Sequence, residues 1–274
     1  MHKRMISMTA ILLATGLLAG CTGSAGAETA AQQETAAQEE TTVQEETTVQ
    51  EESAAQPETT AEPETAAETG TTVFYMGQAT LRITTPEQKT IYIDPFSGEE
   101  SWYEPAADLI LVTHAHPDHN KVDLIQNRKD DCRIIDQDEA VVDGRHMQFD
   151  LGYVKIEAVE ASNQNHDIDK CVGYVLTFSD GQTLYVSGDT STTDQMKELG
   201  TRHLDYAFFC CDGHFNMDTA EASECARLVG ARHSIPYHMA PGGFNHFDRE
   251  IAEQFEAEGR IILEPGEELV LTAG

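Results

Sequence analysis

The sequence reads Thr113-His114-Ala115-His116-Pro117-Asp118-His119 at its most informative point. Four side chains that can bind a metal fall within six residues there, directly after the apolar run Asp108-Leu109-Ile110-Leu111-Val112. That short run predicts a buried strand. Imidazole and carboxylate groups at the end of a strand are ligands that zinc and similar cations accept, so the segment predicts a metal site.

The spacing within this segment predicts two neighbouring ions. Side chains separated by one residue project to the same side of an extended backbone, so His114 and His116 can share one ion. The turn expected at Pro117 redirects the chain, and Asp118 and His119 can then face a second ion. The alternative is a polar loop that happens to be rich in histidine. The chain has 11 His in all, and three of them within six residues argue against that alternative.

The first 21 residues predict a targeting segment that is not part of the fold. A short basic start, His2-Lys3-Arg4, precedes a largely apolar stretch, 6–18, that is too short for a permanent membrane-spanning helix. The next residues, Leu18-Ala19-Gly20-Cys21, resemble the lipobox of bacterial lipoproteins. That resemblance implies a lipid anchor on Cys21 and an extracytoplasmic place in the bacterial cell envelope. The alternative is an ordinary cleaved signal peptide with an incidental cysteine.

Residues 22–72 predict a disordered, solvated tether. They repeat Thr-Thr-Val-Gln-Glu-Glu and related sequences, with 12 Glu and no Lys, Arg or aromatic residue. Such a segment cannot bury enough apolar surface to offset the entropy of ordering it. Ala, Glu and Gln would also suit a helical stalk, but the many Thr residues and Pro57 and Pro63 argue against it.

Residues 73–274 remain, about 200 residues, which is enough for one domain with a sizeable core. The formal charge of the chain is −31, and most of it falls in this domain. The charge disfavours nucleic acid and anionic lipid as non-specific partners. Apart from Cys21, the cysteines are an odd number without the CxxC zinc spacing. We expect Cys210 and Cys211 to be small core residues at the end of an apolar strand.

The domain alternates predicted strands with predicted helices. Apolar runs predict strands at 73–76, 80–84, 90–93, 153–159, 172–178, 183–186 and 204–209. The sequence Ser179-Asp180-Gly181-Gln182 predicts a hairpin between two of them. We expect helices at 121–127, from a capping box at Asp218 to Gly230, and from Asp248 to Gly259.

Three further residues fall where predicted strands end. His166 lies in a polar loop, Asp189 follows the strand at 183–186, and His238 follows a short apolar strand. Each alone is weak evidence, because a loop histidine is more often a surface residue and an aspartate after a strand is often a helix cap. Their order after the His-x-His-x-Asp-His segment raises all three as candidate ligands.

This order of residues resembles the metallo-β-lactamase superfamily over residues 73–274. Within it, the sequence is similar to metal-dependent hydrolases related to ascorbate-6-phosphate lactonase. The segments that carry the resemblance are Val-Thr-His-Ala-His-Pro-Asp-His, Val-Ser-Gly-Asp-Thr, Met-Asp-Thr-Ala-Glu-Ala and Ile-Pro-Tyr-His. The resemblance implies an α/β fold, a four-layer αββα sandwich with two mixed sheets face to face, helices outside and metals at one edge.

The resemblance also assigns seven side chains to two divalent metal ions. The first ion would be bound by His114, His116 and His166, the second by Asp118, His119 and His238, with Asp189 bridging the two. Zinc is the default cation, with manganese and iron as alternatives. A hydroxide between the ions would attack a small ester, lactone or phosphate ester, with Asp118 and Asp189 as the catalytic residues.

Three residues are candidates for supporting roles. Asp94 follows a predicted strand and would hydrogen-bond a ligand histidine, or else serve as a turn residue before Pro95. His214 and His246 would be proton donors or substrate contacts, with surface or structural roles as the alternative.

Two other functions compete with the hydrolase. A surface lipoprotein could keep this fold only to bind a metal or ligand, although the intact ligand set disfavours that reading. Redox chemistry at a di-iron centre uses similar ligands in this superfamily, and it normally needs a flavin partner.

Overall fold

The structure is a computed structural model that describes residues 70–239 and 246–272. The predicted signal segment, Cys21 and the predicted tether up to residue 69 lie outside the described residues. The first strand begins at Thr72, and the main-chain N and hydroxyl of buried Thr71 donate to Asp180 Oδ2 at 2.9 and 2.8 Å. Thr71 and Thr72 are therefore joined to the fold, next to the boundary predicted at residue 73.

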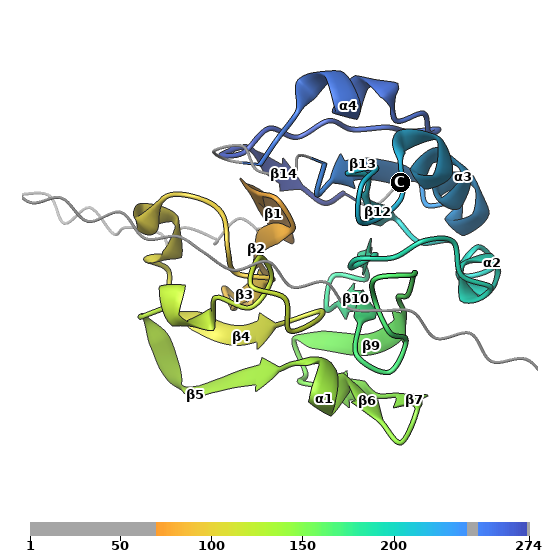
Figure 1. The fold of residues 1–274 in the computed structure, drawn as a ribbon. Coiled ribbons are helices and arrows are strands. Elements are labelled where there is room, and N and C mark those ends of the chain that lie inside the picture. Colours follow the sequence, from red (N-terminus) through yellow and green to blue (C-terminus); the bar gives the residue numbers. More distant parts are fainter. Residues whose placement is uncertain (1–69, 240–245, 273–274) are drawn as a thin grey trace, which may run out of the picture. The chain divides into compact units, whose positions relative to one another are not determined.

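Two mixed six-stranded sheets form the domain (Figure 1). The first sheet has the order β14 (Glu268–Val270), β1 (Thr72–Gly77), β2 (Thr80–Thr84), β3 (Thr90–Ile93), β4 (Ala107–Leu111) and β5 (Arg128–Ile135). The second has the order β13 (His233–Tyr237), β12 (Tyr206–Cys210), β11 (Thr183–Val186), β10 (Val172–Phe178), β9 (Val154–Glu160) and β8 (Gln148–Asp150). A separate small hairpin pairs β6 (Val141–Val142) with β7 (Arg145–His146).

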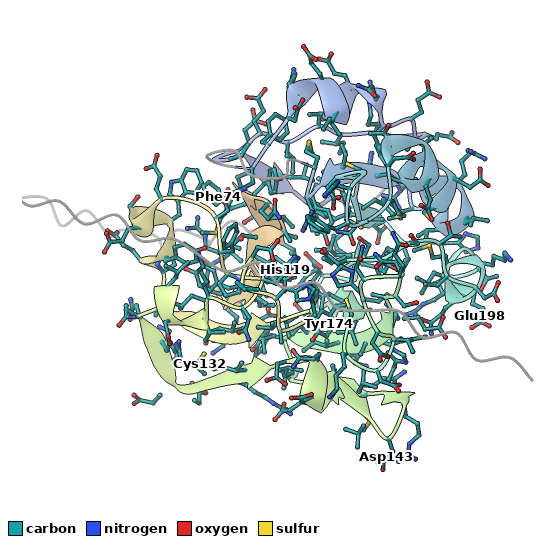
Figure 2. The ribbon with its side chains drawn as sticks, viewed as in Figure 1. Phe74, His119, Cys132, Asp143, Tyr174 and Glu198 are labelled. Atoms are coloured by element: carbon teal, nitrogen blue, oxygen red, sulfur yellow. The ribbon has the colours of Figure 1, made fainter. Side chains whose placement is uncertain are left out.

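The two sheets pack face to face around one apolar core. Fully buried residues of the first sheet, such as Leu81 and Leu109, belong to the same cluster as Tyr174 and Phe208 of the second. The Tyr174 hydroxyl donates to the carbonyl oxygen of Val112 at 2.9 Å and so links the sheets by a hydrogen bond as well. Figure 2 shows Tyr174 and His119 in the interior, whereas Asp143 and Glu198 project at the periphery. The predicted sandwich is confirmed.

The outer layers of the sandwich differ from each other. On the second sheet lie α2 (Gln195–Leu199), α3 (Thr219–Val229) and α4 (Arg249–Gln254), while α1 (Gln137–Ala140) is a single turn next to β6 (Figure 1). The first sheet carries the short 3-10 helices η1 (Glu100–Tyr103) and η2 (Val122–Leu124) over a small second apolar cluster. The outer layer over the first sheet is thus built from 3-10 turns and loops.

The helix predicted at 121–127 was wrong, because the chain forms only η2 there. The carbonyl oxygens of Val122 and Ile125 accept hydrogen bonds from the Arg128 guanidinium at 2.7 and 2.8 Å. The Val122 carbonyl oxygen also accepts from the amide of Ile125 at 3.1 Å, which is the three-residue spacing of a 3-10 turn and not that of an α-helix. Strand β5 then begins at Arg128.

The helix predicted from Asp248 begins as expected but is shorter than predicted. The Asp248 carboxylate accepts from the amides of Glu250 and Ile251, yet α4 ends at Gln254 and does not reach Gly259. The next residue, Phe255, is fully buried and extended, and the Arg260 guanidinium binds its carbonyl oxygen at 2.7 Å. Burial of this ring therefore ends the helix early.

Other local predictions are confirmed. The Asp218 carboxylate accepts from the amide of Glu221 at the start of α3, and Gly230 ends that helix with φ of 59°. The predicted hairpin joins β10 and β11. Cys210 and Cys211 are buried at the end of β12, and all five cysteines of the described residues are free thiols.

Among the described residues, no helix is long and apolar enough to cross a membrane.

The topology brings several strand ends to one edge. Within the first sheet β3 and β4 run parallel, and within the second β11, β12 and β13 run parallel. The carboxyl ends of parallel strands meet at the same edge of a sheet. Five polar residues follow these ends in turn: Asp94, His114, Asp189, Asp212 and His238.

Candidate metal centre

Three histidines converge in a first cluster, which we call the His114 cluster. His116 Nδ1 lies 3.0 Å from His114 Nε2 and 3.2 Å from His166 Nε2. His114 and His166 are buried, whereas His116 is exposed at the surface. The rings come from the loop after β4 and from the loop between β9 and β10, so residues far apart in sequence form one set of nitrogen donors.

A second cluster, the His119 cluster, adjoins the first. His119 Nε2 lies 3.1 Å from His238 Nε2, and Asp118 Oδ2 lies 3.7 Å from each of these two nitrogens. Both histidines are buried, while the Asp118 side chain is 38% exposed. This set therefore combines two nitrogen donors with one carboxylate that also reaches the surface.

Asp189 lies between the two clusters and presents one oxygen to each. Its Oδ2 atom is 3.5 Å from His166 Nε2 and 3.9 Å from His114 Nε2. Its Oδ1 atom is 3.4 Å from His119 Nε2 and 3.3 Å from His238 Nε2. Oδ1 is buried and accepts no hydrogen bond from the described residues. A carboxylate placed in this way has the geometry expected of a bridge between two cations.

The second nitrogen of each buried histidine faces a polar partner. The Nδ1 atom of His114 faces Thr113 Oγ1 at 3.1 Å, and that of His119 faces Asp94 Oδ2 at 2.8 Å. The Nδ1 atom of His166 faces Asn163 Oδ1 at 2.9 Å, and that of His238 faces Asp212 Oδ2 at 3.3 Å. A partner that holds the proton on Nδ1 leaves the Nε2 lone pair free. All four Nε2 atoms then point into the two clusters, so the donor set fits divalent cations.

Electrostatics in the site follow from burial and from Asp189. Burial and the neighbouring His119 lower the pKa of His114 to about 2, so this ring is neutral and can act as a ligand. Burial alone would raise the pKa of Asp189, but His238 and His119 hold it well below its usual value. Although burial opposes its protonation, Asp189 and Asp118 raise the pKa of His238 to about 10. In the absence of a cation, a proton therefore occupies the His119 cluster at neutral pH.

Three residues that support this site were not predicted from the sequence. The Asn216 amide donates to Asp189 Oδ2 at 2.9 Å and to Asp212 Oδ2 at 2.7 Å, which ties the two carboxylates together. Gln78 Nε2 donates to Asp118 Oδ2 at 3.1 Å. Asp212 follows a strand, as Asp189 does, and that signal could have identified it. Nothing local in the sequence marks Asn216 or Gln78.

Three site residues adopt a backbone conformation that non-glycine residues rarely take. The φ angles are 50° at Gln78, 46° at Asp94 and 46° at His238. Left-handed backbone at such residues costs free energy and persists only where the surrounding contacts fix it. The amide of His238 donates to the carbonyl oxygen of Gln78 at 2.9 Å, so two of the three hold each other in place.

A pocket with two lobes opens over the clusters. One lobe, of about 310 Å³, is lined by His116, Pro117, Asn165 and His166 among others. The other, of about 270 Å³, is lined by Gln78, Phe96, Asp212 and His246 among others. Asp118, Phe215 and His238 line both lobes. The two lobes therefore meet at the His119 cluster.

The candidates for supporting roles are placed differently. Asp94 is buried and contacts His119, as proposed from the sequence. His246 packs on the Phe96 ring, with 4.9 Å between ring centroids, and lines one lobe of the pocket. His214 is exposed, packs on Phe215 and lines neither lobe.

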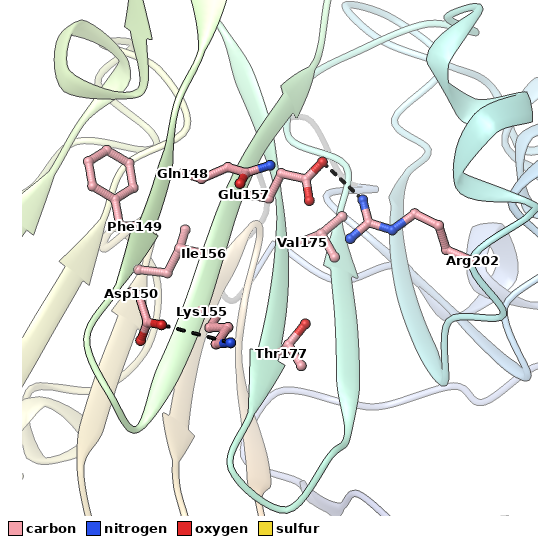
Figure 3. Close-up of a pocket in the computed structure, with 9 residues that line it drawn as sticks. All are labelled: Gln148, Phe149, Asp150, Lys155, Ile156, Glu157, Val175, Thr177 and Arg202. Atoms are coloured by element: carbon pink, nitrogen blue, oxygen red, sulfur yellow. Dashed lines mark ion pairs between the residues drawn. The ribbon is translucent and has the colours of Figure 1, made fainter.

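A separate groove of about 350 Å³ lies on β8, β9 and β10 (Figure 3). Its charged side chains pair with each other: Arg202 with Glu157 at 3.0 Å, and Lys155 with Asp150 at 3.8 Å. None of the candidate metal ligands lines it. The lining of this groove therefore offers no group of metal-binding side chains like that of the histidine clusters.

Comparison with known proteins gives a consistent family. The family model described as the beta-lactamase superfamily domain matches residues 72–238. A metal-dependent hydrolase from Rubrobacter xylanophilus is 30% identical over 234 residues, covering 73% of this chain and 96% of that protein.

Solved structures agree. A protein from Parabacteroides distasonis, assigned as a metal-dependent hydrolase, is 25% identical with a TM-score of 0.56, covering 70% of this chain and 90% of that one. The metallo hydrolase Igni18 from Ignicoccus hospitalis shares the fold, with 22% identity and a TM-score of 0.55 over 73% of this chain and 97% of that one.

Proposed function

Because the chain belongs to the metallo-β-lactamase superfamily, we propose that this metal-dependent hydrolase works with two divalent cations, one in each histidine cluster. The observation that carries the proposal is Asp189, whose two oxygens face different clusters at 3.3–3.9 Å. A buried carboxylate oxygen with no hydrogen bond is costly unless a cation satisfies it.

The donor atoms bear on the identity of the cations. The His114 cluster offers three imidazole nitrogens, which suit zinc, and the His119 cluster adds a carboxylate oxygen that manganese and iron also accept. We propose zinc as the default. The bound cations would supply a nucleophile made from water at neutral pH and would polarise the bond to be cleaved.

The side chains around the clusters position the reacting groups. Asp118 borders both lobes of the pocket and is held by the Gln78 amide, so its carboxylate can orient an attacking water and accept its proton. The Asn216 amide fixes the Asp189 carboxylate by a hydrogen bond, and the Asp94 carboxylate fixes the His119 imidazole. The substrate is a small ester, lactone or phosphate ester.

We also propose that the enzyme is lipid-anchored and extracytoplasmic. The support is the lipobox-like sequence at Cys21 and the acidic, low-complexity segment after it, which would act as a tether. In a bacterial host, the wild-type chain should fractionate with membranes and a Cys21→Ala variant should not. Equal fractionation of the two would contradict the anchor.

Hydrolysis assays on the zinc-reconstituted full chain test the catalytic proposal. The chromogenic substrates are 4-nitrophenyl acetate and bis(4-nitrophenyl) phosphate, and Asp118→Asn should lower kcat by about a hundredfold or more. Asp123→Asn, an exposed carboxylate outside the site, is the matched control. Equal activity of Asp118→Asn and wild type would overturn the role of Asp118. Bound metal with no turnover of either substrate would favour a binding protein.

A further inference from the structure

Apolar groups form much of the wall of both lobes of the pocket. Phe215 lines both lobes, Phe96 lines one and Pro117 the other. Among the described residues that line the lobes, none is Lys or Arg. Lys121 is near, but its ammonium lies over the Phe96 ring, 4.4 Å from the centroid, and lines neither lobe.

Hydrogen bonds between neighbouring side chains and the main chain of Phe215 hold this residue in a fixed position. Its carbonyl oxygen accepts from Asn163 Nδ2 at 3.2 Å and from Asn165 Nδ2 at 2.9 Å. Its amide donates to Asp212 Oδ1 at 2.7 Å. Phe215 as a whole nevertheless remains 53% exposed. A pinned backbone that presents an exposed aromatic ring to the pocket offers a ready contact surface for a flat apolar group.

The negative charges of the carboxylates at the centre would balance the positive charges of two divalent cations, without an anionic substrate. Four carboxylates touch the clusters, those of Asp94, Asp118, Asp189 and Asp212. Two divalent cations would neutralise them and leave no net positive charge for a phosphate group. Proteins that recognise phosphate add Arg, Lys or main-chain amides at a helix N-terminus. The described lining of this pocket has no such cationic side chain.

We propose that the substrates are uncharged carboxylic esters or lactones that carry a flat apolar group, with that group packed against Phe215 and Phe96. The inference rests on the proposed hydrolase and narrows its substrate class by disfavouring phosphate esters. One water is consumed in each turnover. Its oxygen bonds to the carbonyl carbon, the bond from that carbon to the alcohol oxygen breaks, and the alcohol oxygen takes a proton. The carboxylic acid formed loses its proton to solvent.

The test compares matched substrates and a ring deletion on the zinc-reconstituted full chain. The substrates are 4-nitrophenyl acetate, ethyl acetate and bis(4-nitrophenyl) phosphate, each expressed as the rate over that of the His116→Ala variant. We expect wild type to favour the aryl ester over the phosphodiester. Phe215→Ala should lower kcat/KM for the aryl ester about tenfold and leave the ethyl ester nearly unchanged. Phe149→Ala, an aromatic residue in the distant groove of Figure 3, is the control.

Binding provides a readout that is independent of turnover. Calorimetry should show that uncharged acetophenone binds more tightly than dianionic phenylphosphonate, and that Phe215→Ala weakens acetophenone alone. Faster turnover of the phosphodiester, or acetophenone binding that does not depend on Phe215, would overturn the substrate class and leave the metal-dependent hydrolase intact. A chain that binds no zinc and cleaves none of the three substrates would instead overturn the proposed function itself.

Discussion

Replacement of Asp94 by asparagine should change the protonation of a candidate ligand without changing its shape. Asp94 Oδ1 accepts from the amide of Thr113 at 2.7 Å, and Oδ2 faces His119 Nδ1 at 2.8 Å. The asparagine carbonyl must take the Oδ1 position, because the amide of Thr113 donates there. Its NH₂ group then faces His119 Nδ1 and makes that nitrogen an acceptor. The ring proton moves to Nε2, the nitrogen that faces His238 and Asp189.

The expected cost falls mainly on the cation of the His119 cluster, because Asp94 reaches the His114 cluster only through Thr113 Oγ1, which donates to Asp94 Oδ2 at 2.7 Å and faces His114 Nδ1 at 3.1 Å. Loss of a carboxylate partner to a ligand histidine typically weakens metal affinity 10–100-fold, and the full burial of Asp94 leaves no room for water to compensate. We therefore expect about a hundredfold weaker binding, or about 2.7 kcal/mol, at the His119 cluster and little change at the His114 cluster. Titration of the metal-depleted full chain with zinc against a competing chelator measures both affinities.

A second buried carboxylate, on the neighbouring strand β4, provides the control. Asp108 accepts from Lys89 Nζ at 2.8 Å and from the amide of Thr90 at 2.9 Å, at the opposite end of β4 from the clusters. Asp108→Asn should leave both zinc affinities at their wild-type values. The reasoning is refuted if Asp94→Asn binds both ions as wild type does, or if Asp108→Asn loses as much affinity.

Three further outcomes are expected. Zinc loading at pH 7 should release about one proton from the His119 cluster, because Asp189 raises the pKa of His119 and His238 despite their burial, that of His238 to about 10. The stability that this proton gives the metal-free fold is lost as pH rises from about 6.5 towards the raised pKa values. Calorimetric heats independent of buffer ionisation would contradict this. Gln78→Gly should lower kcat about tenfold at unchanged zinc content, because Asp118 loses its amide donor. Glycine is chosen because φ at this residue is 50°. An unchanged kcat would argue that Gln78 does not position Asp118. Tyr174→Phe should lower the free energy of unfolding in urea by about 1–3 kcal/mol, because the carbonyl oxygen after β4 loses a buried donor; an unchanged midpoint would contradict this.

The sequence was sufficient to predict which candidate ligands lie close together in the fold. His-x-His-x-Asp-His is local, and the three more distant candidates each follow a strand or sit in a loop at the same edge. Six lie in the two adjoining clusters and Asp189 lies between them, and the roles of all seven as ligands stay predictions. Asn216 and Gln78 could not be predicted, because their contacts to Asp189 and Asp118 depend on how distant loops meet across the fold.

The fold was predicted where pattern and burial agree. Strand β5 was missed because Arg-Lys-Asp-Asp-Cys-Arg-Ile-Ile is mostly charged and exposed, and it is held at the sheet edge by main-chain pairing with β4. The helix predicted at 121–127 is replaced by a 3-10 turn, and the Arg128 side chain binds the carbonyl oxygens of Val122 and Ile125, a contact that no periodicity encodes.

Metal content is the most direct test of the dinuclear proposal. The full chain, purified without chelator and reconstituted with zinc, is measured by mass spectrometry beside His116→Ala, whose exposed side chain can be removed without disturbing the core. The account predicts about two equivalents of metal per chain in wild type and about one in the variant. Absence of bound metal after reconstitution, or equal content in the two proteins, would contradict it.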